Sequence, residues 1–266
     1  MSSPSASRRT DRNSPELRSV VRRHHRAERA ANWLTALAAA GAFLAAFVAF
    51  SPMPAMGVAV VVATALRVPA FRRSGAVRLR SAAEPEAVVE AFASATPPVL
   101  AFQWGIAVEV VPGGSGAGGG SGADSEVDLS PEADTTPETD AGPTATYEIS
   151  YLLGLRSVSL DLDVDVTRPA ESREGTVPAD AVAVVDIDAT VDGRPWGAYE
   201  ATIRAAEGAA ESQSGDPGTV VDVELRPTRR FGLRRLPQTL VAERYYADAL
   251  AAQGYEVLDR TVSHSL

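Results

Sequence analysis

Two long apolar segments dominate the N-terminal third of the sequence. Residues 31–50 contain no charged residue, and residues 52–71 are interrupted only by Arg67. Twenty helical residues cover roughly the 30 Å hydrocarbon core of a bilayer. Residues 51–54 include two prolines, which block one continuous helix and predict a tight turn. Because backbone groups in lipid need internal hydrogen bonds, the pattern predicts a transmembrane hairpin of two helices.

Two other interpretations of these segments compete with the hairpin. A secretory signal peptide has a short basic start and a small-residue cleavage site, whereas 30 residues precede the first segment and residues 50–52 (Phe-Ser-Pro) are a poor site. A buried pair of helices in a soluble protein is also compatible with Ala-rich segments. The length of the two segments favours the membrane hairpin.

Beyond residue 75 the apolar positions change from a helical to an alternating pattern. Residues 76–81 alternate as a strand, and residues 84–86 (Glu-Pro-Glu) are typical of a helix start. Residues 99–110 predict a second strand. Residues 112–145 are rich in Gly and then in acids, so they predict a disordered insertion that cannot bury enough apolar surface to order itself.

The remaining pattern predicts several antiparallel strands and one long helix. Asp192 and Gly193 are a strong signal for a tight turn between two strands. The helix is expected over residues 236–253, with Gly254 at its C-terminal end and a closing strand over 255–262. The strands are expected over residues 147–153, 157–166, 181–191, 196–204 and 219–225. The predicted fold class is α+β: a transmembrane helical hairpin followed by an antiparallel sheet that grips a long C-terminal helix.

Arginine residues flank both apolar segments, and all 25 basic residues of the chain are Arg. Positive charge marks the cytoplasmic ends of membrane helices. The sequence therefore predicts a cell-membrane protein with two spans and both termini in the cytoplasm. Its parts are a largely disordered basic tail that ends in a short amphipathic helix (1–30), the hairpin (31–71) and an acidic cytoplasmic domain (76–266). The residues expected at the membrane surface are Arg22, Arg23, Arg26, Arg29, Arg67, Arg72 and Arg73.

The part of the chain after the hairpin is strongly acidic. Residues 81–266 carry 12 Arg and 31 acidic residues. Such a composition resembles the proteins of salt-loving archaea, in which solvated carboxylates maintain solubility in concentrated salt. Negative charge repels phosphate, so nucleic acid is not expected as a partner. The basic stretch 226–235 is the exception, and its arginines could hold the domain on anionic lipid headgroups.

The sequence offers few residues for catalysis or metal binding. It has no Cys, which excludes disulfides and thiolate chemistry. His24 and His25 lie in the basic tail and His264 lies near the C-terminus, so neither a metal site nor a cofactor is predicted. Two carboxylate pairs could serve in acid–base catalysis, but in a chain with 34 acids such pairs arise by chance. A third acidic cluster could bind a metal, but the solvated face of a strand is the favoured interpretation. These clusters are Glu243 with Asp248, Asp186 with Asp188, and Asp161 with Asp163 and Asp165.

The order of elements resembles the helix-grip fold of the START-like (SRPBCC) superfamily, which includes the polyketide cyclase-like proteins. Residues 77–90 (Val-Arg-Leu-Arg-Ser-Ala-Ala-Glu-Pro-Glu-Ala-Val-Val-Glu) are similar to that family's first strand and helix, and residues 218–225 resemble its last strand. The likeness covers 76–254, without the family's second small helix and with an extra closing strand. The resemblance implies an apolar cavity between the sheet and the helix. It assigns no catalytic residue to this chain. The candidate cavity residues are Tyr147, Tyr151, Trp196, Tyr199, Tyr245 and Tyr246, whose alternative role is ordinary core packing.

Three functions from different classes are compatible with this organisation. The first is a membrane-anchored, non-catalytic domain that binds a lipid or another hydrophobic small molecule, which requires a cavity of roughly several hundred Å³ under the final helix. The second is a protein-interaction or assembly module tethered at the bilayer, which requires an exposed apolar patch and no cavity. The third is an enzyme of unknown reaction, for which no catalytic residue is predicted.

Overall fold

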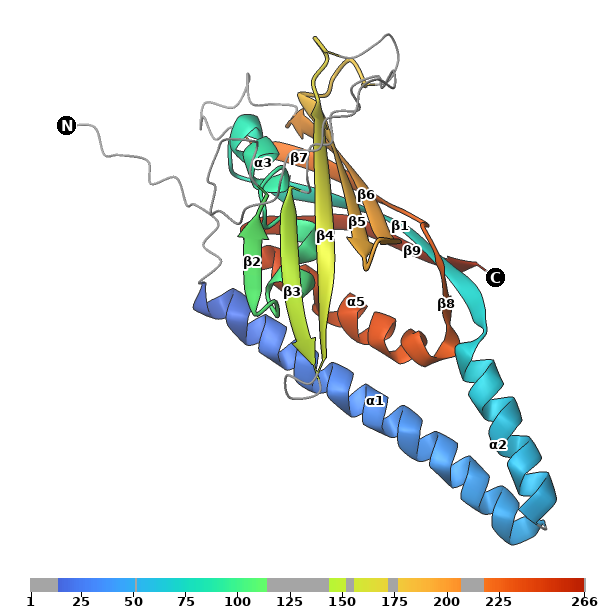
Figure 1. Cartoon of the computed structure of the whole chain (residues 1–266). Helices are drawn as coiled ribbons and strands as arrows, with labels where there is room; N and C mark the ends of the chain where they lie inside the picture. The colour runs from blue at the N-terminus through green and yellow to red at the C-terminus, as the bar shows by residue number, and fades with distance from the viewer. Residues whose placement is uncertain are drawn as a thin grey trace, which may run out of the picture.

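The computed structural model describes residues 14–50, 52–113, 144–151, 156–171, 177–206 and 218–265. The disordered insertion predicted at 112–145 lies outside these residues except at its two ends, and the start of the basic tail, 1–13, lies outside them as well. The described chain consists of two N-terminal helices and a domain with one large sheet and a long C-terminal helix (Figure 1). The α+β fold class is therefore confirmed.

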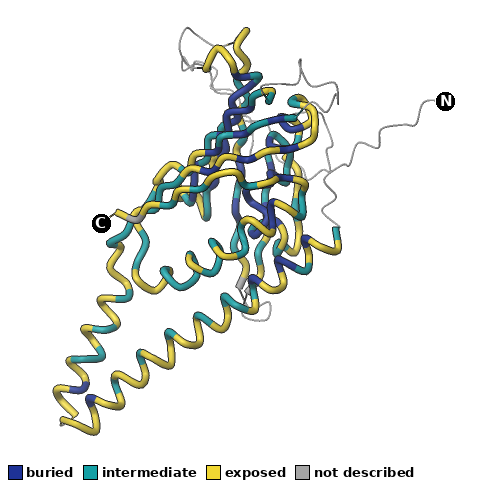
Figure 2. The backbone as a smooth tube through the Cα atoms, turned by 180° about the vertical axis from the view of Figure 1, so that it is seen from behind, coloured by how far each residue is buried: buried dark blue, intermediate teal, exposed yellow. Residues whose placement is uncertain are grey.

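Helix α1 (Pro15–Ala49) is one continuous helix of 35 residues. Pro15 occupies its first turn, and the Ser14 hydroxyl accepts a hydrogen bond from the Leu17 amide at 3.4 Å, so two common signals of a helix start coincide. The amphipathic helix predicted in the basic tail and the first apolar segment thus form a single element. Residues 15–30 pack against the domain, whereas the apolar half is exposed (Figure 2).

The exposed half of α1 carries large apolar side chains. Trp33 is 71% exposed and Leu37 is 62% exposed, although burial of such side chains is the main driving force of folding in water. Of the described helices, α1 is the one long and apolar enough to cross a membrane, with 6% of its apolar window buried. A core helix of a soluble protein would be mostly buried. The exposure therefore favours a membrane span or a signal anchor.

Helix α2 (Pro52–Arg67) contacts α1 but is shorter than predicted. Its 16 residues extend about 24 Å, less than the thickness of the hydrocarbon core. Pro69 cannot continue a helix, and it begins strand β1 (Pro69–Ser81) instead. Residues 69–71, predicted as the end of a second span, therefore belong to the sheet. The structure shows one helix of spanning length, and the hairpin with two spans stays a prediction.

In the described part of the chain, nine strands form one antiparallel sheet. Their order is β2-β3-β4-β5-β6-β7-β1-β8, and β9 also pairs with β1. Strand β1 holds β8 and then β7 in succession along one edge, and β9 pairs with it along the opposite edge. The other strands are β2 (Glu109–Pro112), β3 (Ala145–Tyr151), β4 (Arg156–Thr167), β5 (Ala183–Val191), β6 (Arg194–Ala205), β7 (Thr219–Arg226), β8 (Arg230–Gly232) and β9 (Tyr255–Ser265).

The segment between α3 (Pro85–Phe92) and β2 differs from the prediction. The helix predicted after residue 84 is present as α3 and buries Val88, Val89 and Phe92. The strand predicted over 99–110 is wrong except at residues 109 and 110, which belong to β2, because the preceding chain forms the 3₁₀ turn η1 (Pro98–Leu100) and the short helix α4 (Ala101–Trp104). The Trp104 indole donates a hydrogen bond to the Pro97 carbonyl at 2.9 Å and closes this compact segment. A short apolar run has no periodicity that separates a strand from a buried helical turn.

Two other local predictions are confirmed. Asp192 and Gly193 connect β5 to β6 with φ angles of 50° and 71°, the left-handed conformation that a tight two-residue hairpin requires. Helix α5 (Leu236–Ala251) follows the turn η2 (Leu233–Arg235) and occupies the predicted range. It contacts α1 on one side and β9 on the other, so it lies between the sheet and α1 (Figure 1).

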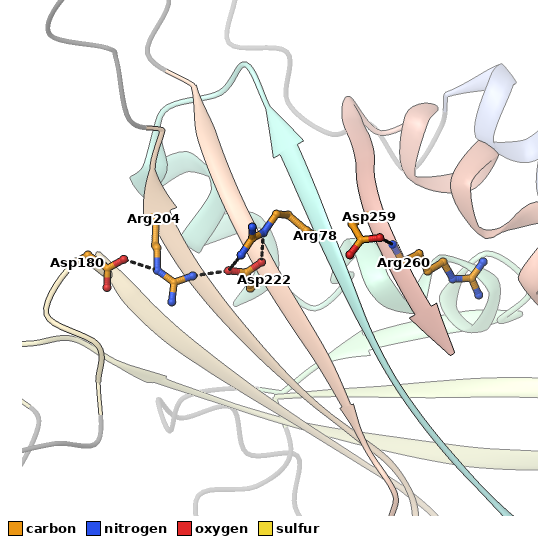
Figure 3. A network of polar contacts seen from close by, with 6 residues as sticks. All are labelled: Arg78, Asp180, Arg204, Asp222, Asp259 and Arg260. Atoms are coloured by element: carbon orange, nitrogen blue, oxygen red, sulfur yellow. Dashed lines mark hydrogen bonds and ion pairs between the residues drawn. The ribbon is translucent and has the colours of Figure 1, made fainter. Parts of the chain in front are cut away.

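The outer face of the sheet carries a network of ion pairs centred on Asp222 of β7 (Figure 3). Arg78 donates two hydrogen bonds to its carboxylate, at 2.6 and 3.1 Å. Arg204 donates to the same group and also pairs with Asp180 at 2.7 Å. The hydrogen bonds from Arg78, opposed by burial and reinforced by the charges of Arg78 and Arg204, lower the pKa of Asp222. The network ties together β1, β6 and β7.

Replacing Asp222 with Asn is expected to destabilise the domain by about 1–2 kcal/mol, since two guanidinium groups lose a shared, half-buried anion. Asp188→Asn is the matched control, because Asp188 lies opposite another acidic residue, Asp163, on the neighbouring strand. Thermal unfolding in detergent measures both variants.

The effect of Asp222→Asn is expected to depend on pH. A carboxylate whose pKa is lowered by folding stabilises the protein above its unfolded pKa of about 4, and this stabilisation is lost as the pH falls below that value. The difference between the parent and Asp222→Asn should therefore shrink as the pH falls below about 4, and a pH-independent difference would contradict this account.

Candidate functional site

A cavity of about 80 Å³ lies between the sheet and the helical segments η1, α4 and α5. Strands β1, β6, β7 and β9 line one side, and residues of the helical segments line the other. The cavity lies under the final helix, as the resemblance to the helix-grip fold implies, but it is smaller than expected. Pockets for drug-sized ligands measure roughly 300–1,000 Å³. The space instead suits a few water molecules or one small organic group.

Apolar side chains form much of the cavity wall. Val77 of β1 and Val223 of β7 are direct partners across the strand pair, so they lie on the same face of the sheet. Phe102 of α4 faces them from the helical side. Gly75 lets β9 approach β1 closely, because a Cβ at this position would lie 2.7 Å from the Thr261 carbonyl oxygen. The wall is therefore built by strand register and by close backbone packing.

Three charged residues meet at the cavity. The Arg73 Nη2 atom lies 3.6 Å from the Glu243 carboxylate, and Arg260 Nη1 donates to the Glu243 main-chain carbonyl at 2.8 Å. The Arg260 guanidinium also lies 4.8 Å from the centroid of the Tyr246 ring, within cation–π distance. The Nε atom of Arg73 is buried and has no hydrogen-bond partner among the described residues. Two guanidinium groups against one carboxylate give this part of the cavity a net positive charge.

Neutral polar groups complete the lining. Burial raises the pKa of the Tyr199 phenol, although the nearby Arg73 charge opposes this shift. Burial also raises the pKa of the Tyr246 phenol, and the charge of Tyr199 adds to the effect. Both hydroxyls are therefore protonated at neutral pH and available as hydrogen-bond donors. The buried Oε1 atom of Gln103 also has no partner within the described part of the chain. Together with Arg73, these groups favour a ligand that accepts hydrogen bonds, such as a carboxylate.

Of the predicted cavity residues, Tyr199 and Tyr246 line the cavity. Tyr245, next to Tyr246 on α5, lies instead toward α1, with its ring 6.2 Å from that of His24. Trp196 lies under the guanidinium of Arg229 at 5.7 Å, away from the cavity lining. Adjacent residues of one helix point in different directions, so the sequence motif Tyr-Tyr supplies one cavity residue and one packing residue.

The remaining two predicted residues do not contribute to the cavity lining as described. Tyr147 is fully buried in the core, and its hydroxyl donates to the Ala95 carbonyl at 2.8 Å. The side chain of Tyr151 lies outside the described part of the structure. Long-range contacts decide these positions, since a buried aromatic on a strand has the same sequence pattern in a core as in a cavity.

The charged lining was missed by sequence reasoning. Arg73, predicted at the membrane surface, lines the cavity, and the other six predicted surface arginines are exposed. Arg260 was not singled out at all. A signal does exist for Arg260, because apolar Val262 lies two residues later on the same strand and therefore shares its face of the sheet. The decisive fact is the pairing of β9 with β1, which brings Arg260 opposite Val77 and cannot be read from local sequence.

A group of exposed arginines surrounds the C-terminal end of α2. Strand β8 pairs with the start of β1, so Phe71 lies opposite Phe231 and Arg72 opposite Arg230. The turn η2 also contacts α2. Nearby on η2 and α5, Leu233 and Leu240 are 40% and 61% exposed. We call this group the arginine rim, and it consists of Arg67, Arg72, Arg230, Arg234 and Arg235.

Comparison with known proteins identifies no family for the chain. No family model matches, and no curated protein matches. The Mll3558 protein from Rhizobium loti is 16% identical with a TM-score of 0.29, and the match covers 69% of this chain and 99% of that one. A protein from Rhizobium leguminosarum is 14% identical with a TM-score of 0.26, covering 68% and 97%. Similarity at this level carries no argument, and the likeness to the START-like family stays a prediction.

Proposed function

We propose that this protein is a non-catalytic binding domain, tethered to the membrane, whose cavity takes the anionic end of a small amphiphile. The observation that carries the proposal is the chemistry of the cavity. Apolar walls meet two guanidinium groups, of which Arg73 keeps a buried, unsatisfied Nε–H among the described residues. A buried donor without a partner costs about 1–3 kcal/mol. A carboxylate would satisfy this donor and balance the excess positive charge.

The size of the cavity restricts the ligand. A volume of about 80 Å³ accommodates a carboxylate with a few methylene groups, so a longer chain would have to extend beyond the cavity. Binding energy would come from the charge-assisted hydrogen bonds and from burial of apolar surface, at roughly 0.8 kcal/mol for each buried CH₂. A short-chain carboxylate such as hexanoate is therefore the simplest probe.

Membrane attachment is part of the same proposal. The exposed apolar half of α1 and the adjacent α2 would enter the bilayer together, with the arginine rim at the cytoplasmic surface. Each Arg near an anionic bilayer contributes about 1 kcal/mol, less in concentrated salt. The exposed side chains of Leu233 and Leu240 support this placement, because they lie beside the rim and have an apolar environment available in the headgroup region.

Filling the cavity tests the binding function. Ala242 of α5 lines the cavity, and Ala242→Leu is expected to occupy the space and weaken hexanoate binding at least tenfold. Saturation-transfer NMR on the full chain in detergent measures the binding. Ala247→Leu is the matched control, since Ala247 lies on the exposed side of the same helix.

Removing the charge provides an independent test. Arg73→Met is expected to abolish the preference for hexanoate over hexanol, since Met keeps most of the apolar stem and loses the donors. No binding of hexanoate by the parent protein, or equal binding by the parent and Ala242→Leu, would contradict the proposal. Hexanol binding by Arg73→Met at the affinity of the parent protein would show that this substitution leaves the cavity intact.

A further inference from the structure

His24 of α1 is a buried histidine that forms no hydrogen bond with the described residues. Its side chain lies on the half of α1 that packs against the domain, is 6% exposed, and stacks on Phe102 with ring centroids 4.2 Å apart. Neither ring nitrogen has a partner among the described residues. A histidine that serves only to fill space in a core usually donates its N–H to a carbonyl or a carboxylate. Two unsatisfied nitrogens therefore call for another explanation.

Two further ligand groups lie beside His24. His25 and Glu28 each place one donor atom so that these two atoms and one nitrogen of His24 all lie within 4.8 Å of one another. The Nδ1 atom of His25 lies 3.4 Å from the Glu28 carboxylate, and its Nε2 atom is buried without a partner in the described part of the chain. Because Glu28 lies one helical turn after His24, the two side chains share a face of α1.

We propose that His24, His25 and Glu28 form a binding site for a divalent transition-metal ion such as Zn²⁺. Imidazole and carboxylate are ligands that Zn²⁺ accepts, with bonds of about 2.0–2.2 Å. Ligand atoms of a tetrahedral site lie about 3.3 Å apart at these bond lengths, so modest side-chain rotations bring the three groups together. Two neutral imidazoles and one carboxylate bind the ion with a net charge of +1, and a fourth position is left for water.

The surroundings of His24 and Glu28 shift the pKa values of both side chains. Burial, opposed by the Glu28 charge and reinforced by His25, lowers the pKa of His24 to about 4. A hydrogen bond from His25, opposed by burial, lowers the pKa of Glu28. Metal ions coordinate the neutral form of imidazole and the ionised form of carboxylate.

The site lies at the junction between the docked and the apolar parts of α1, so a bound metal would stabilise the helix there. The three residues precede the apolar half of α1, which begins at Ala31, and His24 reaches into the contact with α4 and α5. A metal that links positions one turn apart stabilises the helix at the junction between the domain and the membrane-facing half. The site is separate from the cavity, although Phe102 touches both His24 and the cavity space.

Titration of Zn²⁺ into the full chain, stripped with EDTA and held in detergent at pH 7.5, tests the proposal. A competing chromophoric indicator is expected to report one bound ion per chain with micromolar or tighter affinity. His24→Phe keeps an aromatic ring against Phe102 and is expected to weaken binding at least a hundredfold, as is His25→Ala. Glu28→Gln should weaken it at least tenfold. His264→Ala is the matched control, because it removes the third histidine of the chain and should leave the affinity unchanged.

Co²⁺ provides a second readout through the visible absorption of a four-coordinate site, which a merely structural histidine would not produce. Unchanged Zn²⁺ affinity in His24→Phe, or loss of binding in His264→Ala alone, would overturn the assignment. Absence of stoichiometric binding by the parent protein would overturn it as well, and would leave His24 as a packing residue. Ala242→Leu, which fills the cavity, should bind Zn²⁺ normally, so failure of this site and failure of the cavity proposal can be distinguished.

Discussion

Replacing both Leu37 and Leu44 with arginine is expected to abolish stable membrane association of the protein. The two side chains are 62% and 57% exposed and lie two helical turns apart on the apolar half of α1. Arg at the centre of a spanning helix costs about 2.5–3.5 kcal/mol on insertion scales, so the pair costs roughly 5–7 kcal/mol. Helix α2 alone is too short to compensate. Extraction of cell membranes with alkaline carbonate measures the effect.

The control for this experiment is a double substitution of exposed leucines elsewhere. Leu240 on α5 and Leu258 on β9 are 61% and 46% exposed, so Leu240→Arg with Leu258→Arg adds the same charge outside the apolar helix. This variant is expected to stay in the membrane pellet. If the Leu37 and Leu44 variant also stays in the pellet, the apolar half of α1 does not anchor the chain in the bilayer.

Local signals predicted most of the domain. Proline in the first turn identified α3, the Asp192-Gly193 pair identified the β5–β6 hairpin, and Gly254 identified the end of α5. Alternating residues identified strands β3 to β7 and β9, whereas β8 lies in the basic stretch 226–235, for which no strand was predicted. Each of these signals acts through backbone geometry or through burial of one face, which depends on residues near in sequence. Such elements are predictable without knowledge of the tertiary fold.

The failures have a common physical origin in contacts between distant segments. The run 99–110 has no clear period, and its conformation is decided by burial under the sheet and by the Trp104 hydrogen bond. The pairing of β1 with β8 and β9 converts residues 69–73 from a predicted membrane boundary into part of the sheet. That pairing also moves Arg73 into the cavity. Sequence periodicity contains no information about which strand becomes a neighbour.

Residues 15–30 of α1, which pack against the domain, are an intermediate case. The sequence contains a signal for their burial that the prediction did not use. Leu17, Val20, Val21 and His24 follow the spacing i, i+3, i+4 and i+7, which is the apolar face of an amphipathic helix. The sequence pattern predicts a short amphipathic helix in this basic tail, with its arginines at the membrane surface. The structure instead buries it against the domain, with His24 on the same face. A histidine at helical spacing from three apolar residues therefore indicates a buried helix face that packs against the domain, and not a solvated tail.

Introducing carboxylates on this face is expected to detach α1 from the domain. Leu17 and Val21 are 1% and 5% exposed, and Val21 packs close to Gly105. Burying an unpaired carboxylate at each position costs at least about 3 kcal/mol, so Leu17→Asp with Val21→Asp should weaken docking more than a hundredfold. Limited trypsin digestion in detergent measures this release, as faster cleavage at the exposed arginines of residues 22–29.

The same variant separates docking from membrane anchoring, because residues 31–49 are unchanged and should still hold the chain in the membrane fraction. Ala30→Asp is the matched control, since it adds one carboxylate on an exposed position of the same helix. Its digestion should proceed at the rate of the parent protein. Equal digestion rates for the parent, the control and the Leu17 and Val21 variant would show that this half of α1 does not depend on the domain. In that case His24 would be exposed to water, and its two nitrogens would need no partner within the protein.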